Sequence, residues 1–174
     1  ETRAGVCVIG GGAAGILAAI SASRRRRSIG DDRCGPILLL ERNRVLGRKL
    51  AITGKGRANV TNARSVDEFV QAFGSSGRFL YPAFKAFFSD DLSVLLSEAG
   101  LQLKTERGGR VFPVTDKAQD VVQALVSLLA REHIDVRYMA RVRGVAEESG
   151  GWSIKLESSQ AVHCDAVVMA TGGK

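Results

Sequence analysis

The stretch Gly5-Val-Cys-Val-Ile-Gly10-Gly-Gly-Ala-Ala-Gly15 decides the fold that this sequence predicts. Its first half is a short apolar run, which is typical of a strand buried on both faces of a parallel sheet. The glycines break this run, and Ile16, Leu17 and Ile20 follow with the spacing of a helix. A GxGxxG pattern between a strand and a helix predicts a phosphate-binding turn, and hence a dinucleotide site.

Each residue of this turn has a physical role. Gly10 allows a tight bend, Gly12 lets the backbone approach a pyrophosphate, and Gly15 lets the helix pack closely on the strand. Ala13 and Ala14 lie at the helix N-terminus, where free N–H groups and the helix dipole favour phosphate. We therefore predict that these five residues bind the cofactor. A glycine turn that merely connects strand and helix is the alternative.

The next apolar run, Ile37–Leu40, predicts a second buried strand and completes a βαβ unit over residues 5–41. Glu41 follows this strand directly, where a carboxylate would accept hydrogen bonds from ribose hydroxyls. It lies further from Gly15 than is usual, because the predicted surface loop 28–36 is long. We include the adjacent Arg42 in the predicted site.

Residues 65–132 are predicted to be mostly helical, with local signals at the helix ends. These signals are a capping box (Ser65 and Glu68), a proline suited to a first helical position (Pro82), a terminal glycine (Gly100) and an aspartate that caps a longer helix (Asp116).

Residues 134–173 are predicted to be strands. They comprise a strand at 134–138, a three-stranded β-meander at 141–147, 152–157 and 161–164, and a buried strand at 166–170 that runs into Thr171-Gly172-Gly173. A plain NAD domain has no reason to carry this meander and glycine turn, whereas the flavoprotein type of dinucleotide-binding fold does.

Composition limits the remaining possibilities. The chain has 174 residues, of which 45% are hydrophobic and 25% charged, so a packed core is expected and disorder is excluded. No apolar run approaches the ~20 residues of a membrane helix. Three widely spaced cysteines and two histidines argue against a disulfide framework or a zinc site, and a reduced cytoplasmic location is expected.

The charge is concentrated in the first part of the chain. The formal net charge is +7, and residues 1–64 carry 13 basic but only 4 acidic side chains. This surplus suits a ligand with phosphates. We expect Arg24–Arg27 to be a solvated helix C-terminus, because no aromatic residues interleave with the run as they would in a nucleic-acid site.

The segment Gly47-Arg-Lys-Leu-Ala-Ile-Thr-Gly54-Lys-Gly56-Arg57-Ala-Asn59-Val-Thr61-Asn62 resembles the BaiN/RdsA-like flavoproteins, which are NAD(P)/FAD-dependent oxidoreductases. Further matching stretches occur in the same order: Gly10–Gly15, Gly109–Pro113 followed by Asp116–Ala118, and Ala170–Gly173. One departure is Ala58, where the family usually has cysteine.

The resemblance implies an α/β, Rossmann-like FAD/NAD(P)-binding fold of the glutathione-reductase type. It has a parallel central sheet, a helical insertion and a β-meander. Residues 1–174 would be the N-terminal portion of this FAD-binding domain, and a substrate domain is expected after residue 174. The matching segments would line the FAD site.

The cationic and amide side chains of this segment also suit pyrophosphate and the polar edge of a flavin ring. A basic surface loop is the alternative. Lys49, Lys55 or Arg57 could stabilise an anionic reduced flavin. Beyond the glycine turn, Glu41 and Arg42, the predicted cofactor-binding residues are Arg48, Lys49, Thr53, Gly54, Gly56, Arg57, Asn59, Asn62, Val142, Thr171, Gly172 and Gly173.

The sequence therefore predicts an FAD-dependent oxidoreductase that passes hydride from NAD(P)H through the flavin to a small organic acceptor or to oxygen. The expected partners are a small-molecule substrate and a nicotinamide cofactor, without a membrane or nucleic acid. Three alternatives stay open: an NAD(P)-dependent dehydrogenase without flavin, a nucleic-acid-acting protein that uses the basic N-terminal half, and a non-catalytic fragment that holds its cofactor weakly.

Overall fold

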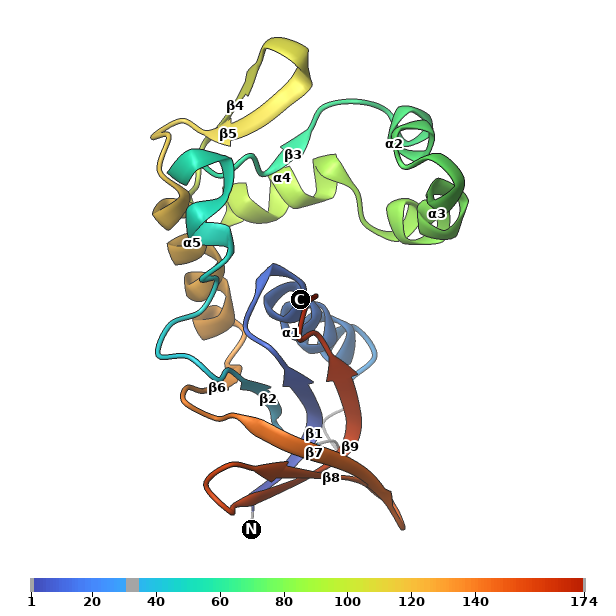
Figure 1. Cartoon of the computed structure of the whole chain (residues 1–174), viewed down its shortest axis with the longest axis vertical. Coiled ribbons are helices and arrows are strands. Elements are labelled where there is room, and N and C mark those ends of the chain that lie inside the picture. Colours follow the sequence, from blue (N-terminus) through green and yellow to red (C-terminus); the bar gives the residue numbers. More distant parts are fainter. Residues whose placement is uncertain (1, 31–34, 174) are drawn as a thin grey trace. The chain divides into compact units, whose positions relative to one another are not determined.

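The computed structural model describes residues 2–30 and 35–173, which form two compact units (Figure 1). The first unit consists of Glu1–Leu50 and Leu125–Lys174, and the second consists of Ala51–Ala124. The centre of the predicted loop 28–36, with Cys34, lies outside the described residues.

A six-stranded sheet forms the first unit. Its strand order is β6-β2-β1-β9-β8-β7, in which β6, β2, β1 and β9 are parallel and β8 and β7 continue antiparallel as a meander. The strands are β1 Thr2–Ile9, β2 Ile37–Leu40, β6 Asp135–Arg137, β7 Val142–Glu148, β8 Gly151–Leu156 and β9 Ala161–Met169. The predicted parallel sheet and three-stranded meander are confirmed.

Helix α1, Ala13–Ser28, follows β1 through the glycine turn and buries Ile16, Ala19 and Ile20. Helix α1 lies beside β1 and β2 (Figure 1). Its apolar positions recur at helical spacing, and their burial fixes one face of the helix against the sheet. The strand, turn, helix and strand predicted over residues 5–41 are confirmed.

The arginines that end α1 have protein partners as well as solvent. Arg24 Nε donates to the Glu132 carboxylate at 3.0 Å, and Arg27 also donates to it. Arg26 Nη1 donates to the Gly35 carbonyl at 2.7 Å. The Glu132 side chain is only 6% exposed, and a carboxylate at that burial requires positive partners. The predicted helix C-terminus is confirmed, and the Arg27 side chain stays 65% exposed, but the prediction did not include these protein partners.

Strand β9 also differs from the prediction. The strands expected at 161–164 and 166–170 are one strand, which pairs with β1 along its length but with β8 only from Ala161 to Cys164. The prediction that its second half is buried is wrong, since Met169 is 61% exposed. The second half of β9 has the apolar sequence of a central strand. It is exposed because β8 stops pairing with β9 at Cys164.

The second unit combines helices with a three-stranded antiparallel sheet of order β3-β5-β4. The strands are β3 Thr61–Asn62, β4 Leu103–Glu106 and β5 Arg110–Pro113; the helices are α2 Val66–Ala72, α3 Gly77–Ala86 and α4 Ser89–Glu98, with α5 Ala118–Arg131 beginning here. Three 3₁₀ turns complete it: η1 Leu50–Gly56, η2 Gly74–Ser76 and η3 Arg107–Gly109. Strands β4 and β5 lie inside the segment predicted to be mostly helical. The sequence did not indicate them, because a four-residue strand gives too little alternation of apolar and polar residues to detect.

Helix ends in this unit test the predicted signals. The capping box at Ser65 and Glu68 is confirmed, and so is Gly100, which ends α4 with φ +82°. Pro82 lies inside α3 rather than at its first position, so that prediction is wrong. Helix α3 starts earlier at Gly77, where a Cβ would lie 1.9 Å from the Val70 carbonyl oxygen, so only glycine lets α2 and α3 approach this closely.

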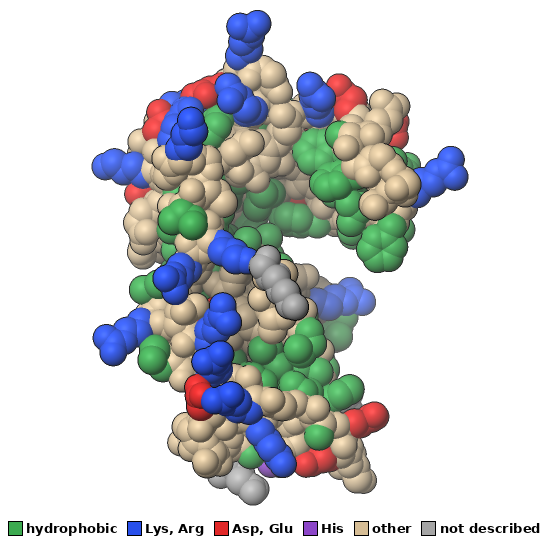
Figure 2. All heavy atoms as spheres, in the orientation of Figure 1, with side chains coloured by type: hydrophobic (Ala, Val, Ile, Leu, Met, Phe, Trp, Pro, Cys, Tyr) green, Lys and Arg blue, Asp and Glu red, His purple; other side chains and the backbone are tan. Residues whose placement is uncertain are grey.

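Aromatic side chains hold α2 and α3 together. Phe69 packs edge-on against Phe84 and Phe88, with ring centroids 5.7 and 4.9 Å apart. Figure 2 shows hydrophobic side chains gathered over these helices, where Phe73 and Phe79 remain exposed. Within the described part of the chain, no helix combines the length and apolar character needed to cross a membrane.

Candidate functional site

The glycine turn has three tightly packed glycines, Gly10, Gly11 and Gly15, and one open glycine, Gly12. A Cβ at Gly10 would lie 2.4 Å from the Ala170 carbonyl oxygen, and one at Gly15 would lie 1.8 Å from the Gly10 carbonyl oxygen. A Cβ at Gly12 would meet nothing within 4 Å. Gly10 and Gly15 therefore allow strand and helix to pack, and the backbone at Gly12 stays open to a ligand.

Helix α1 begins directly after this open position. Gly12 is its N-cap and supplies no side-chain cap, and Ile16 N is the first helical amide to donate backwards, to the Gly12 carbonyl. The N–H groups of Ala13 and Ala14 therefore have no partner within the helix. Together with the helix dipole, they form a site suited to a phosphate.

Glu41 is fixed beside the turn by three N–H donors. Its Oε2 accepts the Gly11 N–H at 2.7 Å, and its Oε1 accepts the backbone and side-chain N–H groups of Asn43 at 2.8 and 2.6 Å. The residue is only 7% exposed. A carboxylate has about four lone-pair positions, so three donors leave one at Oε2, which can accept a hydroxyl.

Asn43 is a residue of the candidate site that the sequence analysis did not predict. It orients the Glu41 carboxylate, and its own Oδ1 lies 3.5 Å from Arg48 Nη1. The available signal was an asparagine two residues after the predicted acidic residue, since short polar side chains bond locally to neighbouring backbone. That signal is common in loops and does not by itself indicate a cofactor site.

The chain after Glu41 returns to the glycine turn. Gly47 N donates to the Gly11 carbonyl at 2.8 Å, and Lys49 Nζ donates to the Gly173 carbonyl at 3.3 Å. Ala140 N donates to the Glu41 carbonyl, two residues before Val142 at the start of β7. Within the first unit, the structure thus brings together the glycine turn, Glu41, Lys49 and the Thr171–Gly173 turn. Arg42 and Arg48 lie exposed on the same loop.

The second unit holds the predicted residues Thr53, Gly54, Gly56 and Arg57 on the loop Thr53–Ala58, and Asn59 and Asn62 follow it. Gly54, Lys55, Gly56 and Ala58 all have positive φ, at +57°, +57°, +85° and +55°. Arg57 N donates to the Gly54 carbonyl, and Ala58 N donates to the Thr53 carbonyl. This conformation is sterically strained at Lys55 and Ala58, because both residues carry a Cβ.

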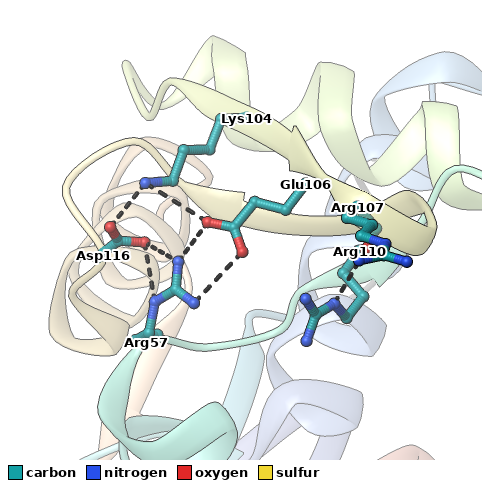
Figure 3. A network of polar contacts seen from close by, with 6 residues as sticks. All are labelled: Arg57, Lys104, Glu106, Arg107, Arg110 and Asp116. Carbon is teal, nitrogen blue, oxygen red and sulfur yellow. Dashed lines mark hydrogen bonds and ion pairs between the residues drawn. The ribbon is translucent and has the colours of Figure 1, made fainter.

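A polar network surrounds Arg57 (Figure 3). Its Nη2 donates to Glu106 Oε1 at 2.5 Å and to Asp116 Oδ1 at 2.6 Å, and its Nε also donates to Asp116. Lys104 Nζ donates to Asp116 Oδ2 at 2.6 Å. The Arg57 guanidinium also lies 4.2 Å from the centroid of the Phe112 ring.

These contacts shift the titration of both carboxyl groups. Hydrogen bonds from Lys104 and then Arg57 hold the pKa of Asp116 below its usual value, and the Arg57 hydrogen bond does the same for the pKa of Glu106. The same pairs raise the pKa of Arg57. Arg57, Glu106 and Asp116 are thus charged at neutral pH, and the network holds two basic and two acidic side chains, whose formal charges cancel. Asp116, predicted to cap α5, instead binds Arg57 and Lys104, and α5 begins at Ala118.

The two predicted asparagines differ. Asn62 is held by the β4–β5 turn: its Nδ2 donates to the Gly108 carbonyl at 2.9 Å, and its Oδ1 accepts the Arg64 N–H. A Cβ at Gly109 would lie 2.5 Å from Asn62 Oδ1, so this contact needs glycine. Asn59 is exposed and follows the buried Ala58. Among the described residues, no group of three or more His, Cys, Asp or Glu side chains could hold a metal ion.

Comparisons with known proteins match nearly the whole chain. A family model described as the HI0933-like protein Rossmann domain matches residues 4–174. A 3-dehydro-bile acid delta(4,6)-reductase of Clostridium scindens is 33% identical over 167 residues, which is 96% of this chain and 38% of that protein. A ribosomal RNA dihydrouridine synthase of Escherichia coli is 28% identical over 169 residues, which is 95% of this chain and 38% of that protein.

The fold is also that of known structures. A 3-ketosteroid-delta4-(5alpha)-dehydrogenase from Rhodococcus jostii RHA1, in complex with 4-androstene-3,17-dione, has a TM-score of 0.68 at 18% identity. The match covers 99% of this chain and 46% of that one. At this identity the likeness supports the fold alone. The chain spans 38% of the length of both curated relatives.

Proposed function

The chain belongs to the family of HI0933-like proteins, the BaiN/RdsA-type flavoproteins, and we propose that it is the FAD-binding part of a flavin-dependent oxidoreductase. One observation carries the proposal: the open backbone of Gly12 at the start of α1 lies beside a buried carboxylate with one acceptor position left. A diphosphate next to a ribose matches this pair of groups.

The residues present fit FAD. The amides from Gly12 to Gly15 would hold the diphosphate, and Glu41 would accept a ribose hydroxyl. Lys49 and the Thr171–Gly173 turn, which contact each other, would hold the cofactor further along. For the flavin ring we propose the loop Thr53–Ala58 with Asn59 and Asn62, because it presents an exposed ammonium, backbone amides and an amide side chain.

Bound FAD supplies two-electron chemistry between a hydride donor and an acceptor. The protein binds and orients the cofactor and sets the charge around it. Lys49 and Lys55 would stabilise negative charge on the cofactor, whereas the charge of Arg57 is balanced by Glu106 and Asp116. We propose NADH or NADPH as the donor, and a small organic molecule or oxygen as the acceptor.

The substrate is proposed to be a small organic molecule, and the location cytoplasmic. The relatives differ in this respect, since one is named for a bile acid and the other for ribosomal RNA. In this chain the basic run at the end of α1 contacts Glu132 and the Gly35 carbonyl. The Glu132 carboxylate offsets part of the positive charge of the run, which supports the small-molecule substrate.

Absorption spectroscopy of the purified chain with FAD tests the proposal. We expect the absorption spectrum of bound flavin to persist after gel filtration. In the complete protein, a reduced nicotinamide should bleach this spectrum. A chain that stays colourless but binds NAD would instead indicate a dehydrogenase without flavin. Salt-dependent retention of RNA by the complete protein would favour the nucleic-acid alternative.

A further inference from the structure

The loop Thr53–Ala58 is held in a conformation that its own sequence does not favour. Four of its residues have positive φ, and two of these, Lys55 and Ala58, are not glycine. An L-residue in this region costs roughly 1–2 kcal/mol, so contacts outside the loop must stabilise it. The contacts of the Arg57 side chain meet that requirement, because they join the loop to β4, to β5 and to the residues before α5.

The donors of Arg57 are directed at carboxylates. Nη2 contacts both Glu106 and Asp116, and Nε contacts Asp116 (Figure 3). Lys104 reinforces the same carboxylate of Asp116. Because two positive and two negative groups share this network, it offers little net charge to a cofactor. The exposed ammonium of Lys55, two residues away, is outside it.

We propose that Arg57 is a positioning residue: by bridging Glu106 and Asp116 it holds the Thr53–Ala58 loop in its left-handed form, and Lys55 rather than Arg57 supplies the loop's charge. This inference rests on the proposed FAD function. It assigns Glu106 and Asp116 a role in cofactor binding although both are acidic and the cofactor is anionic.

This assignment predicts the direction in which FAD affinity changes when a carboxylate is removed. If Arg57 positions the loop, removing a carboxylate partner loosens the loop and weakens FAD binding, as removing Arg57 does. If Arg57 instead contacts the cofactor directly, neutralising Glu106 frees the guanidinium and removes a negative charge, so FAD binds more tightly. Glu106→Gln therefore has opposite effects under the two explanations.

The experiment measures the FAD dissociation constant of the wild type and of Arg57→Lys, Arg57→Ala and Glu106→Gln, with the melting temperature of each. We expect Arg57→Lys and Glu106→Gln each to weaken binding by about 3-fold to 10-fold, because a lysine cannot form the planar two-carboxylate contact. The double variant Arg57→Lys/Glu106→Gln should bind FAD little more weakly than either single variant, since both substitutions break the same contact. Arg107→Ala is the matched control, because it removes an exposed arginine of the same β4–β5 turn.

The rate of trypsin cleavage after Lys55 reports how firmly the loop is held in the absence of the cofactor. Cleavage should be slow in the wild type and in Arg107→Ala, and faster in Arg57→Lys and Glu106→Gln. Tighter FAD binding by Glu106→Gln, or unchanged cleavage in both variants, overturns the inference. A wild type that does not bind FAD overturns the proposed function instead, and cleavage still decides whether Arg57 holds the loop. If Arg57→Ala does not fold, the lysine and glutamine variants carry the test.

Discussion

The glycine turn at Gly10–Gly15 and the loop Thr53–Ala58 are both proposed to bind the cofactor, but they are stabilised in different ways. The turn uses glycine where a Cβ would collide with backbone, and its Gly11 N–H donates to the Glu41 side chain. The loop places Lys55 and Ala58 at positive φ and is held through Arg57 by residues about 50 and 60 positions later. Glycines in its own sequence thus specify the turn, whereas the loop depends on ionic contacts of a side chain with distant residues.

The largest effect is expected at Gly15. Substitution by alanine would place a Cβ 1.8 Å from the Gly10 carbonyl oxygen, so strand β1 and helix α1 must separate. We expect Gly15→Ala to destabilise the protein by about 3 kcal/mol, measured by urea unfolding. Gly12→Ala is the control, because its Cβ meets nothing within 4 Å. It should cost less than about 1 kcal/mol in stability yet weaken FAD binding.

Equal losses of stability in the two variants would contradict this account of the turn. A Gly12→Ala variant that binds FAD as the wild type does would show that the open backbone is not where the phosphates lie.

The next largest effect is expected at Glu41. Glu41→Gln replaces an ionised acceptor of three N–H groups, and we expect FAD binding to weaken roughly 10-fold to 100-fold. Asn43→Ala removes one donor and should weaken it about 5-fold. Binding of ADP is compared with its 2′-deoxy and 3′-deoxy forms. The wild type should prefer one ribose hydroxyl, and Glu41→Gln should lose that preference. Retention of the full preference by Glu41→Gln would remove this carboxylate from ribose recognition.

These contrasts explain what the sequence could predict. The βαβ unit, the glycine turn and Glu41 follow from local patterns, and the structure places them together in the first unit. The contacts of Arg57 could not be predicted in the same way, since Glu106 and Asp116 approach it only through the short strands β4 and β5, which the pattern missed. Likewise, the exposure of Met169 depends on where β8 stops pairing, and the apolar sequence of β9 does not contain that information.

A smaller effect, of opposite sign, is expected at Lys55. Its exposed side chain sits on a backbone with φ +57°, which glycine adopts without strain. Lys55→Gly should stabilise the protein by about 1 kcal/mol, whereas Lys55→Ala keeps a Cβ and should leave stability nearly unchanged. Both variants lose the ammonium and should weaken FAD binding similarly. If the two variants have the same unfolding free energy, the loop is not strained at this residue.

The smallest effect is expected from pH, and it acts on the loop rather than on the turn. Glu106 and Asp116 have lowered pKa values in the folded protein, against ordinary values of 4.5 and 3.8. The unfolded chain therefore binds more protons in this range, and stability rises with pH. The contribution is fully present above about pH 5 and is lost as the pH falls through the lowered folded-state values. We expect the difference in unfolding free energy between the wild type and Glu106→Gln/Asp116→Asn to shrink from pH 6 to pH 3. Because the network is partly exposed, added salt should shrink it as well. A difference that stays constant with pH and salt would mean that Arg57 holds the loop through its contact with Phe112, which carries no titratable group.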